Sequence, residues 1–337
     1  MYKNKITILS LNLGDILMKI KKIVFAILAA CIIGAVFFLM VKAGIDKNKS
    51  NGKIQVVVSN FASYDFLRAI IGDNDEVELT FIIGPGKDAH SYVPGPQDIV
   101  KIQNCDMFVY VGGDSENWSE DTVKGIDKNK TKVVCIADYV DKMEEDKIDG
   151  AEDENEEEEV AFDDHIWTSP SNAIKMVEAL EKNMEEIDSN NAEKYKKNSE
   201  EYIAKIKEVD EKIQEIVDNK VRDTLVFGDK MPMQYFIKYY NLKVSAAFNG
   251  CSTETDPSAK TRAYLETKVK NEKIPVVLYI ELNNGSVAKG IAESVGENCK
   301  AMQIQTLHNI SLDDFNNGET WVSLMTRNLD VLKTALL

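Results

Sequence analysis

The stretch from residue 77 to residue 96 reads Val77-Glu-Leu-Thr-Phe-Ile-Ile83 and then Gly84-Pro-Gly-Lys-Asp-Ala-His90-Ser-Tyr-Val-Pro-Gly-Pro96. Its first seven residues are mostly apolar, which predicts a buried strand. The glycines and prolines that follow end this strand and turn the chain sharply. His90 is therefore expected in a loop just beyond the carboxyl end of a strand, where open α/β sheets bind their ligands.

The same strand pattern recurs along the chain and alternates with helical segments. The predicted strands cover residues 54–58, 77–83, 107–111, 132–136, 224–227, 242–248, 275–280 and 301–307. The predicted helices cover residues 63–71, 95–102, a segment from 171, and 190–217, 233–240, 258–271, 286–295 and 320–337. Strands that alternate with helices predict parallel sheets covered on both faces, so the expected fold class is α/β.

The segment 190–217 is predicted to form one long helix. Its apolar residues recur near helical spacing, at Tyr195, Tyr202, Ile203, Ile206, Val209, Ile213, Ile216 and Val217. At 1.5 Å per residue such a helix is about 40 Å long, which is enough to span two lobes. A stiff helix of this length would limit how far two lobes can swing relative to each other.

The negative charge of the chain is concentrated in one block. The 337 residues are 44% hydrophobic, enough for two ordinary domains, and carry a formal charge of −16. Residues 138–164 hold fifteen acidic residues against two lysines, which leaves about −3 for the rest. No basic stripe supports nucleic-acid binding. The centre of the acidic block, residues 152–159, cannot bury its side chains and is expected to be a disordered loop.

The N-terminal segment has the pattern of a membrane anchor or a secretory signal. Three lysines between residues 19 and 22 precede an apolar run at 23–41. The tetrapeptide Leu-Ala-Ala-Cys that ends at Cys31 fits a bacterial lipobox, but the apolar run continues beyond it, which favours an uncleaved anchor over lipidation. The body from about Lys53 is expected on the outer face of the cytoplasmic membrane, behind a flexible polar linker at 46–52.

Cysteines can pair outside the cytosol, so their surroundings matter. Cys105 and Cys135 lie beside or inside apolar runs and are expected to be buried thiols. Cys251 and Cys299 lie in loop-like surroundings of the same half, where a disulfide and two free thiols are both open. The cysteine spacings are not those of a zinc finger.

Histidine is scarce in this chain, and all three histidines lie where elements begin or end. Besides His90, His165 lies in Asp-Asp-His-Ile-Trp-Thr-Ser-Pro, which opens a helix, and His308 follows the last predicted strand. Asp229 and Glu281 also come directly after predicted strands. Imidazole nitrogens combined with a carboxylate suit zinc, whereas Mn²⁺ prefers more oxygen ligands. The pattern predicts a metal site in which all three histidines take part.

Several spaced motifs carry a resemblance to a known family. They are Phe81-Ile-Ile-Gly-Pro-Gly-Lys-Asp-Ala-His90-Ser-Tyr, Pro94-Gly-Pro-Gln-Asp-Ile99, Asp106-Met-Phe-Val-Tyr-Val-Gly112, Asp164-His-Ile-Trp-Thr-Ser-Pro170-Ser-Asn-Ala173, Asp256-Pro-Ser258 and Trp321-Val-Ser-Leu-Met325-Thr-Arg-Asn328-Leu-Asp. Together they resemble the solute-binding proteins of bacterial zinc and manganese ABC transporters. The resemblance covers essentially the whole chain from residue 53 to residue 337.

The resemblance implies a domain organisation. Two Rossmann-like lobes with parallel sheets, at 53–187 and 220–337, would be joined by one long rigid helix within 188–219 and would bind one metal ion in the cleft between them. Residues 1–52 would serve as signal, anchor and linker. The acidic loop, at about 141–164, would belong to the first lobe, where zinc-binding relatives often carry a histidine-rich loop.

The resemblance also implies a set of ligands. His90 and His165 match the first two ligand positions, and His308 stands where the family usually has an acidic fourth ligand. The third ligand is usually His or Glu five residues before a Tyr-Phe pair, a position that is Lys230 in this chain. The neighbouring Asp229 is therefore expected to be the ligand. Glu281 and Glu254 are its substitutes.

The function implied is that of a membrane-tethered, extracytoplasmic carrier that delivers Zn²⁺, with Mn²⁺ as the alternative, to an ABC permease and its ATPase. The carrier is expected to be a monomer, and its binding to weaken below about pH 6, because protonated imidazole cannot ligate. A zinc hydrolase is disfavoured because the sequence has no His-Glu-x-x-His, Gly-x-Ser-x-Gly or P-loop motif. A surface adhesin remains a competing class.

Overall fold

The computed structural model describes residues 18, 52–151, 162–250 and 256–337, and Lys53–Leu337 forms one compact unit. The predicted anchor at 23–41, with Cys31, lies outside the described residues, as do Cys251 and Glu254. Within the described ranges, no helix is both long enough and apolar enough to cross a membrane. Cys105 and Cys299 are buried free thiols, and Cys135 is a half-buried one.

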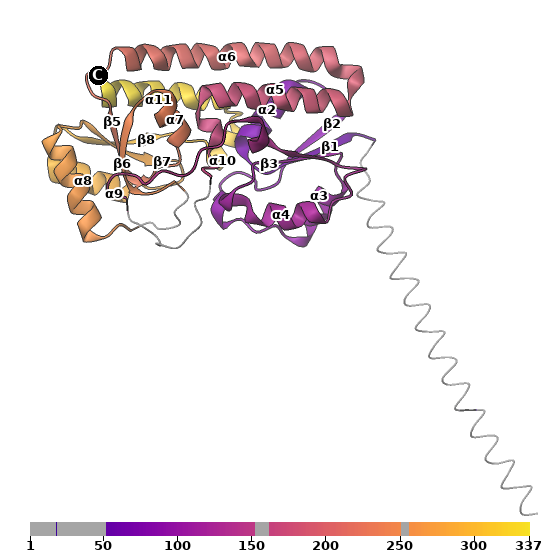
Figure 1. Cartoon of the computed structure of the whole chain (residues 1–337), viewed down its shortest axis with the longest axis horizontal. Coiled ribbons are helices and arrows are strands. Elements are labelled where there is room, and N and C mark those ends of the chain that lie inside the picture. Colours follow the sequence, from indigo (N-terminus) through magenta and orange to yellow (C-terminus); the bar gives the residue numbers. More distant parts are fainter. Residues whose placement is uncertain (1–17, 19–51, 152–161, 251–255) are drawn as a thin grey trace, which may run out of the picture. The chain divides into compact units, whose positions relative to one another are not determined.

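The first sheet contains four parallel strands in the order β2-β1-β3-β4. Its strands are β1 Ile54–Val58, β2 Val77–Phe81, β3 Met107–Tyr110 and β4 Lys132–Cys135. The helices of this half are α2 Phe61–Ile71, α3 Pro96–Asn104, α4 Asn117–Lys124 and α5 Pro170–Ile187. Figure 1 shows α5 and α2 on one side of this sheet and α3 and α4 on the other.

The second sheet repeats this topology with the order β6-β5-β7-β8. Its strands are β5 Thr224–Lys230, β6 Lys243–Phe248, β7 Val276–Ile280 and β8 Lys300–Ile304. Its helices are α7 Gln234–Tyr239, α8 Ala259–Asn271, α9 Ser286–Val295, α10 Leu312–Asn316 and α11 Trp321–Leu336. The predicted α/β class with parallel sheets is confirmed. In both sheets the strand order reverses beside the first strand, which is where such sheets bind ligands.

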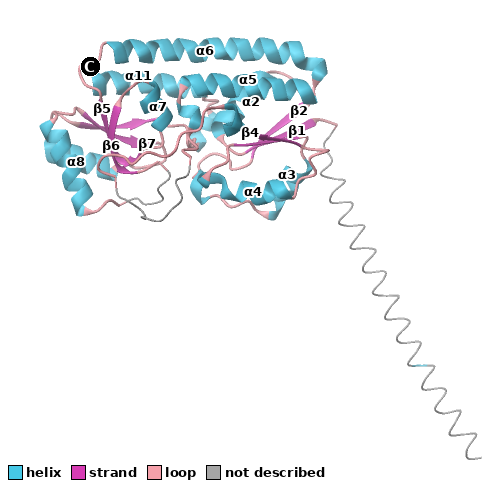
Figure 2. Ribbon diagram, in the orientation of Figure 1, coloured by secondary structure: helices cyan, strands magenta, loops and turns pink. Residues whose placement is uncertain are grey.

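The predicted long helix is also confirmed. Helix α6, Ala192–Asp218, has 27 residues and runs past the helices of both sheets, as Figures 1 and 2 show. Its buried stripe packs against α2, α5 and α11. The buried carboxylate of Asp65 in α2 accepts hydrogen bonds from the Tyr202 hydroxyl of α6 and from the backbone N–H of Trp321. One carboxylate therefore joins helices that come from distant parts of the chain.

Two short helices and several strand boundaries differ from the sequence predictions: β2 ends at Phe81 and β8 at Ile304, earlier than expected, and β5 ends later. Helices α4 and α10 were not predicted, because segments of eight and five residues show too little periodicity to be recognised. Asp229 was expected directly after a strand, and this is wrong, because β5 continues through it to Lys230. Its register with β6 shifts between Phe227 and Lys230, where an irregularity prolongs the pairing.

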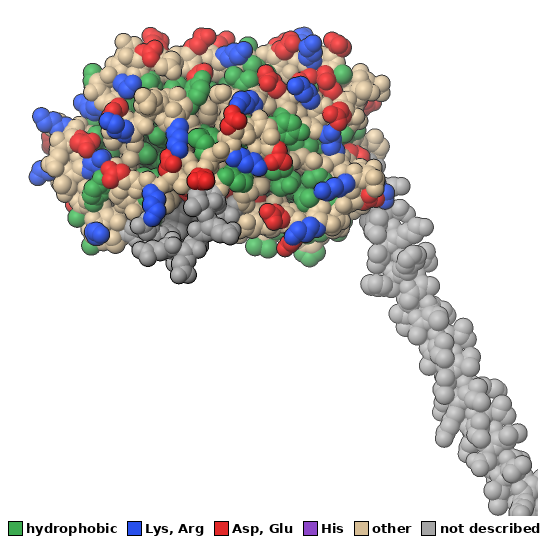
Figure 3. Space-filling view, in the orientation of Figure 1, with side chains coloured by type: hydrophobic (Ala, Val, Ile, Leu, Met, Phe, Trp, Pro, Cys, Tyr) green, Lys and Arg blue, Asp and Glu red, His purple; other side chains and the backbone are tan. Residues whose placement is uncertain are grey.

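Both ends of the acidic block are ordered, and the prediction of a disordered loop concerned only its centre, residues 152–159. Residues 143–149 cross to the second sheet, where Asp149 forms a bridge with Ser245 of β6. Ion pairs hold the same segment, between Asp146 and Lys238 at 2.7 Å and between Asp149 and Lys268 at 3.0 Å. Residues 152–161 lie outside the described part of the chain. On the face drawn in Figure 3, acidic and basic side chains are interspersed.

The turn after β3 is held by a buried carboxylate. Glu116 Oε2 accepts hydrogen bonds from the N–H groups of Val111 at 2.7 Å and Gly112 at 3.2 Å. Gly113 has a φ of 89°, and a Cβ added to it would lie 2.8 Å from Cβ of Asp164. Burial raises the pKa of Glu116 to about 7, against the effect of its hydrogen bonds. This turn places the first sheet against the loop that carries His165.

Replacing Glu116 with Gln should change how stability depends on pH. A carboxyl whose folded pKa lies above its unfolded value contributes stability that is complete below the unfolded pKa and is lost as pH rises through the folded pKa. Relative to Glu116→Gln, the wild-type free energy of unfolding should therefore fall between about pH 4.5 and about pH 7, by on the order of 3 kcal/mol. Chemical denaturation across this range measures the difference.

The exposed Glu120 of α4, the helix that follows Glu116, supplies the control, since Glu120→Gln should leave the wild-type pH dependence unchanged. If the free energy of unfolding depended on pH equally in Glu116→Gln and in the wild type, the predicted loss of stability with rising pH could not be assigned to Glu116.

Candidate metal centre

The backbone of two of the three histidines is held by the same kind of hydrogen bond, from the histidine N–H to an aspartate side chain. Asp88 Oδ1 accepts the backbone N–H of His90 at 2.9 Å, and Asp163 Oδ1 accepts the backbone N–H of His165 at 2.8 Å. Each aspartate lies two residues before its histidine and stabilises the start of a 3₁₀ turn, as Asx motifs do. Each imidazole is therefore presented from a rigid turn.

The three imidazoles converge on one place. Their ring centroids are 4.6 Å apart for His90 and His308, 4.8 Å for His165 and His308, and 5.9 Å for His90 and His165. One nitrogen from each ring can be chosen so that all three lie within 4.8 Å of one another. His90 lies in the loop after β2 and His165 after β4, both strands of the first sheet, while His308 lies after β8 of the second. The cluster therefore joins the two halves of the compact unit.

Several nitrogen atoms in this cluster are available to a ligand. His165 Nε2 and His308 Nδ1 face each other at 2.7 Å and share a hydrogen bond. The Nε2 atoms of His90 and His308 are buried and have no hydrogen-bond partner among the described residues. Because buried polar atoms are usually satisfied, Nε2 of His90 is available to a ligand, whereas Nε2 of His308 faces Asp88 Oδ1 at 3.7 Å. A cation that prefers nitrogen ligands would supply the partner.

The surroundings set the charge of each ring. Burial, reinforced by the other two histidines and by Lys230, lowers the pKa of His90 to about 2. Burial likewise lowers the pKa of His308 to about 3, although the carboxylate of Asp88 opposes the shift. At His165 burial acts in the same direction, but the carboxylates of Asp164 and Asp163 outweigh it and raise the pKa. Two of the three rings are thus held neutral, the form in which imidazole ligates.

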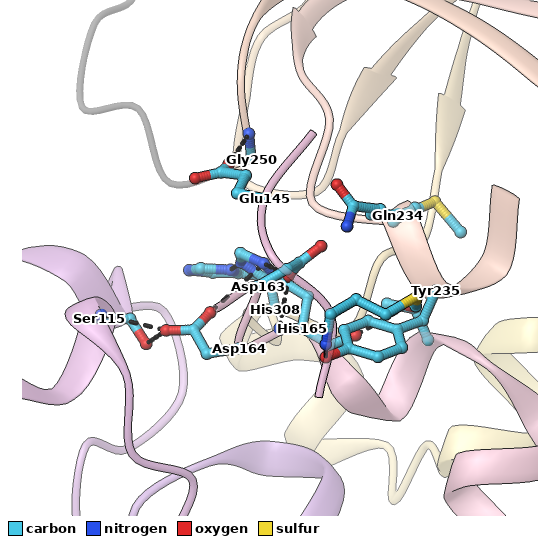
Figure 4. A network of polar contacts seen from close by, with 12 residues as sticks. Ser115, Glu145, Asp163, Asp164, His165, Gln234, Tyr235, Gly250 and His308 are labelled. Carbon is cyan, nitrogen blue, oxygen red and sulfur yellow. Dashed lines mark hydrogen bonds and ion pairs between the residues drawn. The ribbon is translucent and has the colours of Figure 1, made fainter. Parts of the chain in front are cut away.

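The acidic pair before His165 forms a polar network that Figure 4 shows from close by. His165 Nδ1 lies 2.8 Å from Asp163 Oδ1 and 3.3 Å from Asp164 Oδ1. Asp164 Oδ2 also accepts hydrogen bonds from the backbone N–H and the hydroxyl of Ser115. With Nδ1 directed at these carboxylates, Nε2 of His165 points toward His308.

The two predicted carboxylate ligands lie elsewhere in the network. Asp229 accepts the N–H of Lys230 at 2.8 Å and the N–H of Ile280 at 3.2 Å, and thereby joins β5 to β7. Burial raises its pKa, against the effect of these hydrogen bonds. Among the described residues, neither Asp229 nor Glu281 belongs to the group of mutually close ligand atoms.

Glu281 supports the loop that carries His308. Its Oε2 accepts the N–H of Thr306 at 2.8 Å, and its Oε1 accepts the Thr306 hydroxyl at 2.8 Å and the N–H of Asn309 at 3.0 Å. Trp167 reaches the same loop, because its indole N–H donates to the Thr306 carbonyl at 3.0 Å. The Trp167 ring also packs edge-on against His165, with centroids 5.6 Å apart. The position of His308 is thus set by residues from both halves.

Sequence reasoning missed the supporting residues Asp88, Asp163, Glu116 and Asn309. A signal for two of them is visible in the sequence, because His90 and His165 are each preceded at the second position by an aspartate. The Asn309 contact had no such signal. Its side-chain oxygen accepts the N–H of Ala89 at 3.2 Å, across 220 residues of sequence.

Comparisons with known proteins found relatives that match most of the chain. A family model described as zinc-uptake complex component A, periplasmic, matches residues 56–335. The zinc-binding lipoprotein AdcA of Streptococcus pneumoniae is 28% identical over 290 residues, which are 86% of this chain and 57% of that protein. The chain thus spans little more than half of that relative. The high-affinity zinc uptake system protein ZnuA of Bacillus subtilis is 30% identical over 325 residues, covering 91% of this chain and 96% of that protein.

Solved structures show the same fold. The Zn(II)-bound ZnuA-like domain of Streptococcus pneumoniae AdcA has a TM-score of 0.70 at 27% identity, covering 85% of this chain and 99% of that domain. The metal-dependent lipoprotein YcdH of Bacillus subtilis has a TM-score of 0.71 at 28% identity, covering 85% and 100%.

Replacing Glu281 with Ala should destabilise the protein. The substitution leaves the buried donors of Thr306 and Asn309 without their acceptor, which should lower the free energy of unfolding by about 3 kcal/mol. Urea denaturation measures the loss, and Glu297→Ala, at an exposed position of the same half, should stay within about 0.5 kcal/mol of the wild type. Equal stability of the two variants would show that Glu281 does not support the His308 loop.

Proposed function

Since this chain belongs to the family of zinc-uptake complex component A, we propose that it captures Zn²⁺ outside the cytoplasmic membrane and delivers it to the permease of an ABC importer. The observation that carries the proposal is the convergence of all three histidines of the chain at the contact between the halves. Relatives that cover most of the chain are named for zinc binding and zinc uptake rather than for an enzymatic reaction, which supports a carrier.

The ion is bound by His90, His165 and His308, two from the first lobe and one from the second. We assign the lobes to residues 53–187 and 220–337, because the two sheets fall within these ranges. A ligand drawn from each side makes binding of the ion and contact between the lobes mutually dependent. Release to the permease then requires that these loops separate.

A carboxylate completes the coordination, and Asp229 is our first candidate, with Glu281 as its substitute. In the structure both oxygens of each carboxylate accept hydrogen bonds from buried donors. Ligation by either residue therefore requires that it exchange a hydrogen bond for the ion. That exchange carries a smaller cost at Asp229, which accepts two hydrogen bonds, than at Glu281, which accepts three.

Zinc is the preferred cargo, and Mn²⁺ is the alternative. Three imidazole nitrogens with at most one carboxylate form the donor set of a tetrahedral zinc site, whereas manganese is usually bound by more oxygen atoms. A nitrogen-rich site also follows the general order of affinities, in which Zn²⁺ binds more tightly than Mn²⁺.

The carrier acts as a monomer, tethered to the outer face of the membrane near residues 23–41, with an ABC permease and its ATPase as partners. The apolar run at 23–41 supports a tether, and the name of the pneumococcal relative, a lipoprotein, supports attachment to a membrane. The family description, a component of an uptake complex, supports partners of this kind.

Replacing His90 or His165 with Ala should reduce zinc affinity by orders of magnitude, because each substitution removes one of three nitrogen ligands and leaves two. Calorimetric titration in the presence of a competing chelator measures the affinity of each variant. The exposed Lys243→Gln is a suitable control and should bind zinc as the wild type does. Unchanged zinc affinity in both His90→Ala and His165→Ala would disprove the site.

Metal analysis of protein purified without chelator should find about one equivalent of zinc. In a competition titration, Mn²⁺ at a concentration equal to that of zinc should fail to displace it, because nitrogen-rich sites favour Zn²⁺ over Mn²⁺. Preferential retention of manganese would identify the alternative cargo within the same family.

A further inference from the structure

The outer nitrogens of two imidazoles each point at an aspartate. His165 directs Nε2 toward the cluster, while its Nδ1 lies 2.8 Å from Asp163 Oδ1. His308 has the opposite orientation, because its Nδ1 faces His165 and its Nε2 lies 3.7 Å from Asp88 Oδ1. In both rings one nitrogen thus faces the cluster and the other faces a carboxylate. This is the arrangement by which carboxylates orient metal-binding histidines.

Asp88 is also in contact with a cation from the second half of the protein. Its Oδ2 lies 3.5 Å from Nζ of Lys230, whose side chain is only 11% exposed at the end of β5. Its Oδ1 supports the turn of His90, so the two oxygens have different neighbours. A single carboxylate therefore lies between a ligand of the first lobe, a ligand of the second lobe and a buried ammonium group.

We propose that Asp88 is the positioning carboxylate of His308, and that Lys230 competes for this carboxylate and so weakens zinc binding. This inference rests on the proposed function of zinc capture. When zinc binds, Asp88 closes the present distance of 3.7 Å and accepts the Nε2–H of His308, which leaves the lone pair of Nδ1 directed at the ion. Lys230 attracts Asp88 toward β5, away from His308, and it also places a positive charge near the ion. Both the lost orientation of His308 and the repulsion between the charges weaken zinc binding.

The contact between Asp88 and His308 depends on the two loops that carry them. Gly86 donates its backbone N–H to the Ile310 carbonyl at 2.7 Å, and Ala89 donates to the side chain of Asn309 at 3.2 Å. These hydrogen bonds hold the Asp88 loop against the His308 loop. The positioning contact can therefore form only when the halves are together, which couples the orientation of a second-lobe ligand to the approach of the first lobe.

Substitutions at these two residues should have opposite effects on zinc affinity. Loss of a carboxylate that orients a metal-binding histidine typically reduces affinity by about 10- to 100-fold. Asp88→Ser is the informative variant, because serine can still cap the turn of His90 but cannot reach His308. Lys230→Gln should raise zinc affinity several-fold. The double variant should bind more tightly than Asp88→Ser alone, because it lacks the unpaired ammonium group.

Lys243 provides the matched control for charge. Its ammonium group pairs with Asp223 at 2.9 Å and is exposed, so Lys243→Gln should leave zinc affinity unchanged. Circular dichroism of each variant confirms that it is folded before its affinity is measured.

The orientation of His308 can be observed directly. In ¹⁵N-histidine-labelled protein loaded with zinc, long-range ¹H–¹⁵N spectra should show His308 bound through Nδ1 and protonated at Nε2. In zinc-loaded Asp88→Ser the Nε2–H signal should exchange faster with water, because its acceptor is gone.

The results that would overturn the inference differ from those that would overturn the proposed function. Zinc bound through Nε2 of His308, wild-type affinity in Asp88→Ser, or weaker binding in Lys230→Gln would each refute the roles of Asp88 and Lys230 while leaving zinc capture intact. A wild-type protein that binds no zinc in the same titrations would refute the proposed function itself.

Discussion

The packing of three imidazoles in one small space, two of them buried and His90 half-buried, is the constraint on which the site depends. Burial disfavours the protonated rings, and it lowers the pKa of His90 and His308 far below the ordinary value. His165 differs because two carboxylates face it. The cluster therefore combines neutral donors with a nearby negative charge, which suits a divalent cation that prefers nitrogen ligands.

Carboxylates around this cluster support the backbone: those of Asp163 and Glu281 are buried, whereas that of Asp88 is 42% exposed. Asp88 and Asp163 each accept the backbone N–H of a histidine two residues later, and Glu281 holds the loop of His308 through three hydrogen bonds. Buried hydrogen bonds of this kind are costly to break, so they fix the directions of the imidazoles before any ion arrives. Side chains that hold the backbone and side chains that bind the ion are thus largely different residues.

The long helix determines how these loops can meet. Because α6 runs past the helices of both sheets and packs on α2, α5 and α11, it links the halves along one side, away from the loops that carry the histidines. The buried carboxylate of Asp65 in α2 adds hydrogen bonds to α6 and to the start of α11.

The sequence by itself determined the α/β class, most strand positions, the long helix and the three histidines, because periodicity, turn residues and the scarcity of histidine are local properties of the chain. It placed Asp229 beyond a strand that in fact contains it, since the irregular pairing with β6 is not encoded locally. Only the tertiary structure decided which nitrogen of each ring faces the cluster, and that Asp88 lies between His308 and Lys230. These contacts join residues more than 140 positions apart, and they exist only because two separate sheets bring their loops together.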